Sequence, residues 1–390
     1  MKLVHVVPTY YPAVRYGGPI WSVHALCKAL VQRGHDVQVL TTNVDGPDVL
    51  DVPTGVPVDL DGVDVRYFPS RFARRLYWSP AMNLQLPGLL LEADFVHLHS
   101  IFLAPTSSAA RVAESLGKPW CVSPRGALVP ELISRRSTLA KRIWMLINER
   151  RTLERASFIH ATSTLEAQDA ERIGYRLPPI RVIPNGVDVP HRNGSAFNSA
   201  INRIGGSPYL LFLGRINWKK GLDRLIPAMA HVPGFRLVVA GNDEEQLTPR
   251  LMRLAQQSGV LERIDFPGAV AGDQKLNLLR GATLLILPSY SENFGNVLLE
   301  SLAAGRPVAM TAEVGLAPAI HAAGAGEMIS GQPSEMGRQL SALVADTRNL
   351  DAMGERGYQL VQSKYTWASV ASAMEQAYLE AISARRMASS

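Results

Sequence analysis

Hydrophobic and polar positions along the chain alternate between two kinds of segment. Short runs rich in β-branched residues are each followed by a longer run whose apolar positions recur with a helical period. This alternation predicts parallel strands spaced by helices, and therefore sheets covered on both faces. One series of strands is expected at residues 4–7, 37–41, 95–98, 119–123 and 158–161, and a second at 209–213, 236–240, 264–266, 284–287 and 308–311.

A polar segment separates the two series of strands. Residues 187–207 are rich in Asn, Ser, Gly and Pro, which is typical of a linker between domains. We therefore expect an α/β protein with two Rossmann-like, doubly wound parallel-sheet domains, over residues 1–186 and 208–366. A helical pattern over residues 367–390 is expected to return to the N-terminal domain.

The composition narrows the possible classes of protein. The chain has 390 residues, of which 47% are hydrophobic, enough for two buried cores. No run approaches the roughly 18 apolar residues of a membrane span, and the apolar run before Pro8 is too short for a signal peptide. Two cysteines make no disulfide framework, so a cytoplasmic location is expected.

The modest net charge of +6 is concentrated in two segments. Residues 71–80 carry three arginines and no acid, and residues 133–156 carry seven cations against two acids. The second segment has apolar residues at helical spacing, including Trp144, which favours docking on an anionic membrane surface. A solvated helix face is the alternative, and no nucleic-acid motif accompanies the charge. The residues expected to face the membrane are Arg71, Arg74, Arg75, Arg135, Arg136, Lys141, Arg142 and Trp144.

Several enzyme classes lack their motifs in this chain. No G-x-G-x-x-G follows a strand, and Walker A, G-x-S-x-G and zinc spacings are missing from the sequence. Asp59 and Asp61 have the D-x-D spacing of some metal-dependent transferases, but the following glycine indicates a turn between short strands. We expect no bound metal and no cofactor.

The most informative stretch, residues 284–310, joins a strand, a polar loop and an amphipathic helix. The loop places the N–H groups of Phe294, Gly295 and Asn296 at a helix N-terminus, which favours an anion such as a diphosphate. Glu292 and Glu300 are eight residues apart, and at the helical rise of about 1.5 Å per residue we expect them about 12 Å apart along the axis. That is too far for a hydrolase carboxylate pair, and it suits one carboxylate at each end of a nucleotide-sugar.

A second stretch places cations after a strand. Arg215 and Lys220 follow the strand at 209–213, where the carboxyl end of an open sheet suits a phosphate-rich ligand. Gly241 ends the strand at 236–240 and is expected on the same edge.

These residues carry a resemblance over nearly the whole chain. It is similar to family 4 retaining glycosyltransferases of the GT-B fold, of the exopolysaccharide or surface-polysaccharide type. The motifs are the E-x7-E pair, the Arg215 and Lys220 pair, the segment 183–188 and the double glycine at Gly17 and Gly18. The resemblance implies a nucleotide-sugar donor bound by the second domain, an acceptor bound mostly by the first, retained anomeric configuration and no required metal. The donor-binding set it implies is Gly17, Gly18, Arg215, Lys220, Gly241, Asn293, Phe294, Gly295, Asn296 and Glu300.

In the first domain, two histidines lie at the end of a predicted strand. We expect His97 and His99 on opposite faces, one buried and one free to point into the cleft; a structural role for both is the alternative. By resemblance, His99 acts near the donor sugar with Glu292, Arg215 and Lys220 as the catalytic group. Arg125 and Tyr16 are expected on the acceptor side, and Glu166 is expected to face the cleft by resemblance alone.

The predicted function is transfer of a sugar from a UDP- or GDP-sugar to a glycan acceptor. The favoured acceptor is a polyprenyl-diphosphate-linked oligosaccharide, handled by a peripheral enzyme at the inner face of the plasma membrane. The alternatives are a GT-B-type sugar-nucleotide epimerase or phosphorylase, and a non-catalytic sugar-nucleotide-binding subunit.

Overall fold

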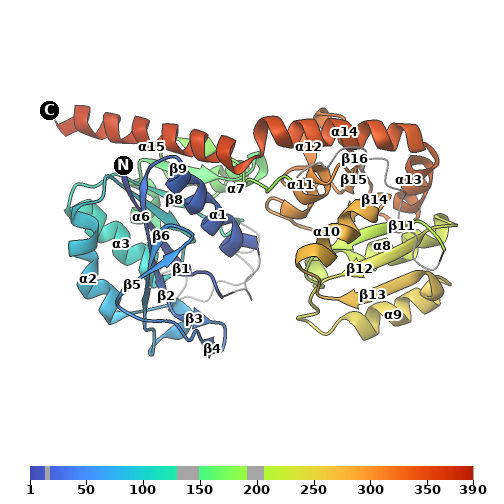
Figure 1. Ribbon diagram of the computed structural model, residues 1–390, viewed down its shortest axis with the longest axis horizontal. Helices are drawn as coiled ribbons and strands as arrows, with labels where there is room; N and C mark the ends of the chain where they lie inside the picture. The colour runs from blue at the N-terminus through green and yellow to red at the C-terminus, as the bar shows by residue number, and fades with distance from the viewer. Residues whose placement is uncertain (14–17, 130–148, 191–205, 390) are drawn as a thin grey trace. The chain divides into compact units, whose positions relative to one another are not determined.

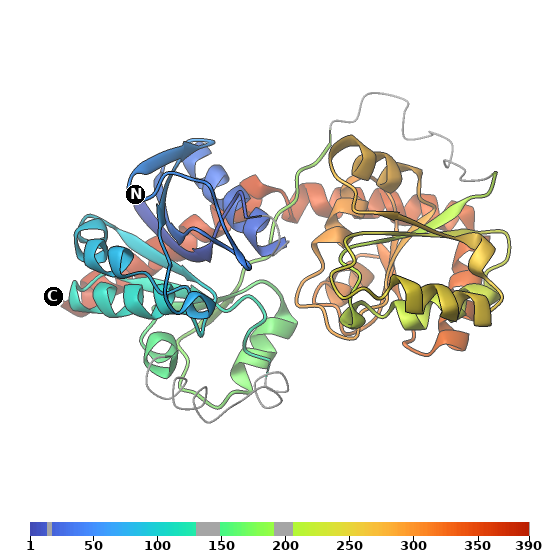
Figure 2. The ribbon, with the colours of Figure 1, turned by 90° about the horizontal axis from the view of Figure 1, so that it is seen from below.

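The computed structural model describes residues 1–13, 18–129, 149–190 and 206–389. The chain forms two compact units (Figures 1 and 2). Unit 1 comprises Met1–Gly186 and Trp367–Ser390, and unit 2 comprises Val187–Thr366. Most of the predicted linker, residues 191–205, lies outside the described residues.

Unit 1 is built on an eight-stranded sheet in the order β10-β9-β8-β7-β1-β2-β6-β5. All neighbouring strands are parallel except β5, which pairs antiparallel with β6. The strands are β1 (Lys2–Thr9), β2 (Asp36–Thr42), β5 (Pro57–Leu60), β6 (Val63–Phe68), β7 (Phe95–His99), β8 (Trp120–Ser123), β9 (Phe158–Ala161) and β10 (Ile180–Val182), with a separate hairpin of β3 (Val44–Asp45) and β4 (Asp48–Val49).

Helices cover both faces of this sheet. Alternate strand residues supply two cores, one with residues of α1 and α15 and the other with residues of α2 and α3. The helices of unit 1 are α1 (Gly18–Gln32), the single turn η2 (Arg74–Leu76), α2 (Pro80–Leu91), α3 (Ala104–Ser115), α6 (Arg150–Glu154), α7 (Thr164–Glu171) and α15 (Trp367–Ser389).

Unit 2 has a six-stranded, all-parallel sheet in the order β13-β12-β11-β14-β15-β16. The strands are β11 (Tyr209–Leu213), β12 (Arg236–Ala240), β13 (Ile264–Gly268), β14 (Leu284–Leu287), β15 (Val308–Met310) and β16 (Gly326–Met328). The helices are η5 (Trp218–Lys220), α8 (Leu222–Ala228), η6 (Met229–His231), α9 (Thr248–Gln257), η7 (Leu261–Arg263), α10 (Gly272–Gly281), α11 (Asn296–Ala303), α12 (Ala317–Ala322), α13 (Pro333–Ala345) and α14 (Thr347–Lys364).

The predicted α/β class with parallel sheets is confirmed, and every strand expected from the sequence is present. The short strands β3, β4, β10 and β16 were missed, because runs of two or three residues carry little pattern of their own. Among the described residues, no helix is both long and apolar enough to cross a bilayer.

Helix α15 packs on unit 1 beside α1, although 334 residues separate their nearest ends in the sequence (Figure 1). Its residues Val370, Met374 and Tyr378 are buried in the core shared with α1. The Tyr378 hydroxyl also bonds Nδ1 of His97 on β7, at 2.7 Å. Both apolar burial and this hydrogen bond therefore hold the chain end on unit 1.

Two glycines in unit 2 allow backbone segments to approach closely at the carboxyl edge of the sheet. Gly241 has φ +155°, and a Cβ there would lie 1.8 Å from the carbonyl oxygen of Gly214. Gly221 has φ +68°, and a Cβ there would lie 2.0 Å from the carbonyl oxygen of Pro288. Side chains at these two positions would force the loops after β11, β12 and β14 apart.

The substitution Gly241→Ala is expected to lower the stability of unit 2 by about 2 kcal/mol or more, because the new methyl group overlaps a backbone carbonyl. Gly259→Ala is the matched control: its φ is +69° and nothing lies within 4 Å, so only backbone strain of about 1 kcal/mol remains. Thermal unfolding of the two variants measures the difference. Equal melting temperatures would show that the close approach is not required.

Candidate functional site

The strand order of unit 2 brings two loops together at one edge of its sheet. β11 pairs with β12 on one side and with β14 on the other. The strand order therefore reverses at β11: β12 and β13 extend the sheet in one direction, and β14, β15 and β16 extend it in the other. Ligands of open α/β sheets bind at the carboxyl ends of strands flanking such a reversal. The loops after β11 and β14 meet here, where the amide of Tyr290 donates to the carbonyl of Lys219 at 2.7 Å.

A lysine–glutamate pair joins these two loops. Nζ of Lys220 donates to Oε2 of Glu292, and both side chains are mostly buried. The backbone of Glu292 is fixed separately: its amide donates to the carbonyl of Glu313 at 3.1 Å, and its carbonyl accepts from Gly315 at 2.9 Å. A carboxylate and a cation are thus fixed side by side at the point where the strand order reverses, between β11 and β14.

The second glutamate of the motif has its own cation. Oε1 of Glu300, on α11, accepts from Nζ of Lys275, on α10, at 2.7 Å. Arg215 likewise pairs with Glu244, at 3.2 Å. Sequence reasoning missed Lys275 and Glu244, since 25 and 29 residues separate these partners and no local pattern links them.

The helical spacing assumed for the two glutamates was wrong. Helix α11 begins at Asn296, so Glu292 lies in the preceding loop and the 12 Å estimate does not apply. Phe294 is only 4% exposed and packs in the core of unit 2. Gly295 occupies the helix N-cap with φ +95°, and a Cβ there would crowd Val314, which explains the glycine independently of any ligand.

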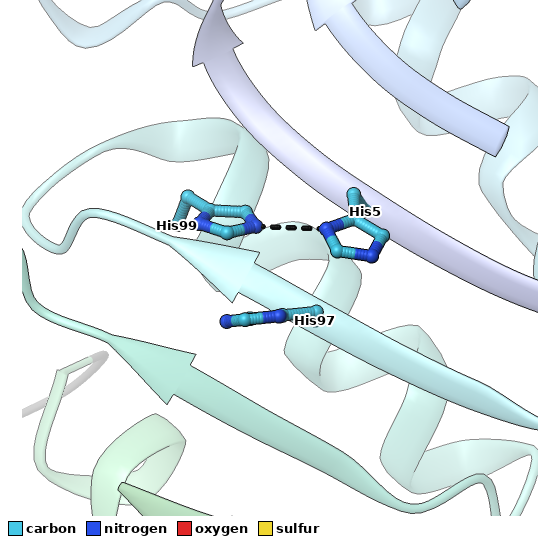
Figure 3. Close-up of side chains that lie close together, drawn as sticks. All are labelled: His5, His97 and His99. Carbon is cyan, nitrogen blue, oxygen red and sulfur yellow. Dashed lines mark hydrogen bonds between the residues drawn. The ribbon is translucent and has the colours of Figure 1, made fainter. Parts of the chain in front are cut away.

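In unit 1, histidines form a buried cluster on one face of the sheet (Figure 3). The rings of His97 and His99 stack with centroids 4.0 Å apart, and each residue is 1% exposed. The expectation of opposite faces was wrong, because residues two apart on a strand point the same way. His5 on β1 joins them, with its Nδ1 3.0 Å from Nε2 of His99.

Burial keeps this cluster neutral. It lowers the pKa of His5 and of His160 to about 3, with the Arg125 guanidinium as a further cause. Burial likewise lowers the pKa of His97 and His99 well below the usual range. Each ring therefore carries one N–H and one acceptor nitrogen near neutral pH.

The hydrogen bonds of the cluster form two branches. Because the rings are neutral, the donor and acceptor of each bond in the first branch can be assigned. Nε2 of His160 donates to the carbonyl of Ile183 at 2.8 Å, so its Nδ1 accepts from the Ser123 hydroxyl at 2.6 Å. Ser123 in turn accepts from Nε2 of His97 at 2.6 Å. The remaining nitrogen of His97 accepts from Tyr378, and the branch is complete.

The second branch begins at Arg125. A guanidinium only donates, so its Nη2 donates to Nδ1 of His99 at 3.4 Å. His99 therefore donates from Nε2 to Nδ1 of His5. Nε2 of His5 then carries a proton, and it is buried without a hydrogen-bond partner. Both nitrogens of His99 are engaged with protein atoms, so a direct contact between this ring and a sugar is not what the structure presents.

Arg125 lies at the end of β8 in a turn that neighbouring residues hold. It has φ +55°, a conformation that is costly for a non-glycine residue. Nη1 donates to Oδ1 of Asn185 at 2.9 Å. Oε1 of Glu166 accepts the amide of Gly126 at 2.6 Å, and Glu166 is 2% exposed. Glu166 therefore fixes the turn, and the expectation that it faces a cleft was wrong.

The three histidines are the one group in the described residues whose spacing suits a metal ion. Three features argue against a metal ion there. Both nitrogens of His97 are bonded within the protein, and the stacked planes of His97 and His99 keep their lone pairs from converging. The cation of Arg125 also contacts His99.

The remaining predicted residues fall in several places. Tyr16 and Gly17 lie outside the described residues, and Gly18 begins α1. Asp61, from the D-x-D segment, accepts from Nε2 of His24 at 3.0 Å and from Nζ of Lys28 at 3.3 Å, which gives it a structural role. The predicted membrane-facing residues outside the described part of the chain are Arg135, Arg136, Lys141, Arg142 and Trp144.

Two family models match the chain. The model described as "Glycosyl transferases group 1" matches residues 195–360, and the one described as "Glycosyl transferase 4-like domain" matches residues 17–186. Together they cover most of both units.

Relatives match over nearly the whole chain and over most of their own length. A glycogen synthase of Mycobacterium tuberculosis is 30% identical, over 95% of this chain and 93% of the relative. A D-inositol 3-phosphate glycosyltransferase of Xylanimonas cellulosilytica is 27% identical, over 99% and 97%.

Solved structures share the fold. Sucrose-phosphate synthase of Thermosynechococcus elongatus has a TM-score of 0.76 at 21% identity, with 98% of this chain and all of that one covered. HepE of Anabaena, solved with UDP and glucose, has a TM-score of 0.74 at 17% identity, over 96% and 98%. These likenesses place the chain in the two-domain GT-B architecture.

Stability is expected to fall as the pH is lowered from about 6.5 toward 3. The buried histidines stay neutral in the folded state and take up protons on unfolding, so the unfolded state binds more protons over that range. Each such histidine contributes up to about 1.4 kcal/mol per pH unit. The melting temperature measured between pH 5 and 8 tests this.

His5→Gln should flatten that profile, whereas His321→Gln, at an exposed position of unit 2, should leave it unchanged. If the melting temperature of His5→Gln depends on pH in the same way as that of His321→Gln, the prediction that the buried histidines are neutral is contradicted.

Proposed function

The chain belongs to the glycosyl transferases group 1 family and is a glycosyltransferase, and from that premise we propose that its donor is a nucleotide-sugar bound by unit 2. The observation that carries the proposal is the pair of glutamates at the carboxyl edge of unit 2, each held by a lysine from another segment. Such pairs offer both a carboxylate for sugar hydroxyls and a cation for phosphate. UDP- and GDP-sugars both fit this chemistry.

Each charged group has a role in the proposed complex. Lys220 and Arg215 neutralise the diphosphate, together with amides of residues 294–296 at the start of α11. Asn293 and Gly241 border the same site. Glu292 accepts from hydroxyls of the sugar, and Glu300 accepts from the ribose diol. A donor phosphate competes for Lys220 with Glu292, so binding releases that carboxylate toward the sugar.

The proposed reaction retains the anomeric configuration and uses no metal, because protein cations supply the charge on the leaving group. The acceptor oxygen attacks the anomeric carbon on the face that the diphosphate leaves. The bond from that carbon to the diphosphate oxygen breaks, and the diphosphate takes the proton of the acceptor hydroxyl. No side chain forms a covalent intermediate.

We assign the acceptor to unit 1. Arg125 is partly exposed, and its guanidinium is held by His99 and Asn185, so it suits an acceptor phosphate. In this proposal His99 positions Arg125 and does not touch the sugar. Tyr16, Gly17 and Gly18 belong to the same side.

The acceptor we favour is a polyprenyl-diphosphate-linked oligosaccharide of surface polysaccharide synthesis. Its lipid requires a peripheral enzyme at the inner face of the plasma membrane. The exposed Arg71 and Arg75 support docking on anionic lipid. Arg74 is engaged instead in holding the β3–β4 turn, through the carbonyls of Pro47 and Asp48.

A panel of nucleotide-sugars tests the donor. The expected result is a rise in melting temperature with one sugar nucleotide and slow hydrolysis of that donor without an acceptor. An epimerase would instead convert the sugar nucleotide to an isomer, a phosphorylase would require inorganic phosphate, and a binding subunit would show the shift without any turnover. Absence of a shift with every UDP- and GDP-sugar would overturn the proposal.

Glu300→Ala is expected to weaken donor binding by about tenfold or more while changing stability by less than about 1 kcal/mol, because Glu300 is partly exposed and its loss removes contacts to the ribose. Isothermal titration with the donor found above measures the affinity. Glu327→Ala, at an exposed glutamate elsewhere in unit 2, is the matched control and should bind as wild type. Near-wild-type affinity in Glu300→Ala would sink the assignment.

A further inference from the structure

Helix α2 has apolar residues on two opposite faces. One face, made by Met82, Leu86 and Leu90, is buried in the core of unit 1. The other is exposed, with Leu84 at 84% and Leu91 at 59% of full exposure. A helix on the surface of a protein normally presents polar residues on its outer face.

The exposed face is a continuous apolar stripe. Pro80, Leu84, Pro87, Gly88 and Leu91 are its exposed residues, and helical geometry places them within an arc of about 100°. The twelve residues of the helix, PAMNLQLPGLLL, include no charged side chain. The two polar residues, Asn83 and Gln85, flank the stripe and do not interrupt it.

The segment before α2 adds exposed aromatic and aliphatic side chains. Phe72 is 72% exposed, and Leu76 and Trp78 are each 38% exposed. Of the thirteen exposed large hydrophobic residues in the described part of the chain, five therefore lie between residues 72 and 91. We call residues 71–91 the apolar rim; such a concentration marks an interaction surface.

Charge identifies the partner. The apolar rim contains three arginines and no acidic residue. Arg71 and Arg75 are exposed, whereas Arg74 bonds backbone carbonyls. Aromatic and leucine side chains beside exposed arginines match the boundary between lipid headgroups and acyl chains, where the apolar groups insert and the cations meet lipid phosphates.

We propose that the apolar rim inserts into an anionic lipid bilayer, with the outer face of α2 lying in the membrane interface. This deepens the peripheral attachment proposed above and rests on that part of the proposed function. It adds a hydrophobic anchor to the electrostatic attraction, so attachment persists when salt screens the arginines.

Vesicle flotation of the full chain tests the anchor. With vesicles of equal parts phosphatidylglycerol and phosphatidylcholine, the wild-type chain floats at low salt and remains partly bound at about 1 M NaCl. The combined variant Phe72→Ser, Leu84→Ser and Leu91→Ser lowers the partition coefficient about a hundredfold. Each large apolar side chain is worth about tenfold at full burial in lipid, and these three can insert only their exposed parts, 59–84% of each residue.

A matched variant controls for loss of surface hydrophobicity in general. Val182→Ser, Met252→Ser and Leu379→Ser remove three side chains of 44–47% exposure elsewhere on the chain, and this variant floats as wild type. Flotation of the rim variant at the wild-type level, or full release of the wild type by salt, overturns the proposal. Retained donor-induced stabilisation in the rim variant separates a failed anchor from a failed donor assignment.

A label at position 84 gives a second readout that does not depend on the combined variant folding. Both native cysteines are buried, and burial raises the pKa of the Cys27 thiol to about 12, so a probe on Leu84→Cys is selective. An environment-sensitive dye there emits as in water without vesicles and shifts to shorter wavelength with anionic vesicles. A shift without vesicles identifies a second copy or another part of the chain as the occupant, and overturns a lipid-facing surface.

Discussion

The site of unit 2 depends on how closely two loops approach at the carboxyl ends of β11 and β14. Gly221 lies against the carbonyl of Pro288, and the amide of Tyr290 closes onto Lys219. This contact sets Lys220 beside Glu292, although 72 residues separate them in the chain. A bulkier residue at position 221 would separate the cation from the carboxylate, so the charge arrangement follows from a steric constraint on the backbone.

The structure of unit 1 depends on a different constraint: its buried histidine rings need hydrogen-bond partners. The buried cluster holds His5, His97, His99 and His160, and neutral rings in two hydrogen-bonded branches satisfy nearly all of their nitrogens. One branch links the returning helix α15 to β9, and the other links Arg125 to β1. The rings therefore tie the chain end and the β8 turn to one rigid sheet, which holds Arg125 in a strained conformation.

The acidic and basic groups of the candidate site form ion pairs with one another within the protein. Lys220, Lys275 and the exposed Arg215 each contact a carboxylate, which at the two partly buried lysines limits the cost of holding charge. In the proposed complex, the phosphates of the nucleotide-sugar pair with the cations and its hydroxyls donate to the carboxylates, so each charged group exchanges one partner for another. Preorganised pairs of this kind suit a site that must stabilise a leaving diphosphate.

The sequence by itself determined the α/β class, the positions of the main strands and the glutamates of the E-x7-E motif, because strand periodicity and glycine-bounded loops are local signals. It did not reveal Lys275 or Glu244, and the helical rise used to space Glu292 from Glu300 does not hold because Glu292 lies in a loop. It also assigned His99 and Glu166 to a cleft, whereas the structure buries them. Those outcomes depend on which distant segments meet at a sheet edge, and spacing along the chain does not encode that. The apolar outer face of α2 was equally invisible, since the same leucines predict burial until the packing shows which face remains in solvent.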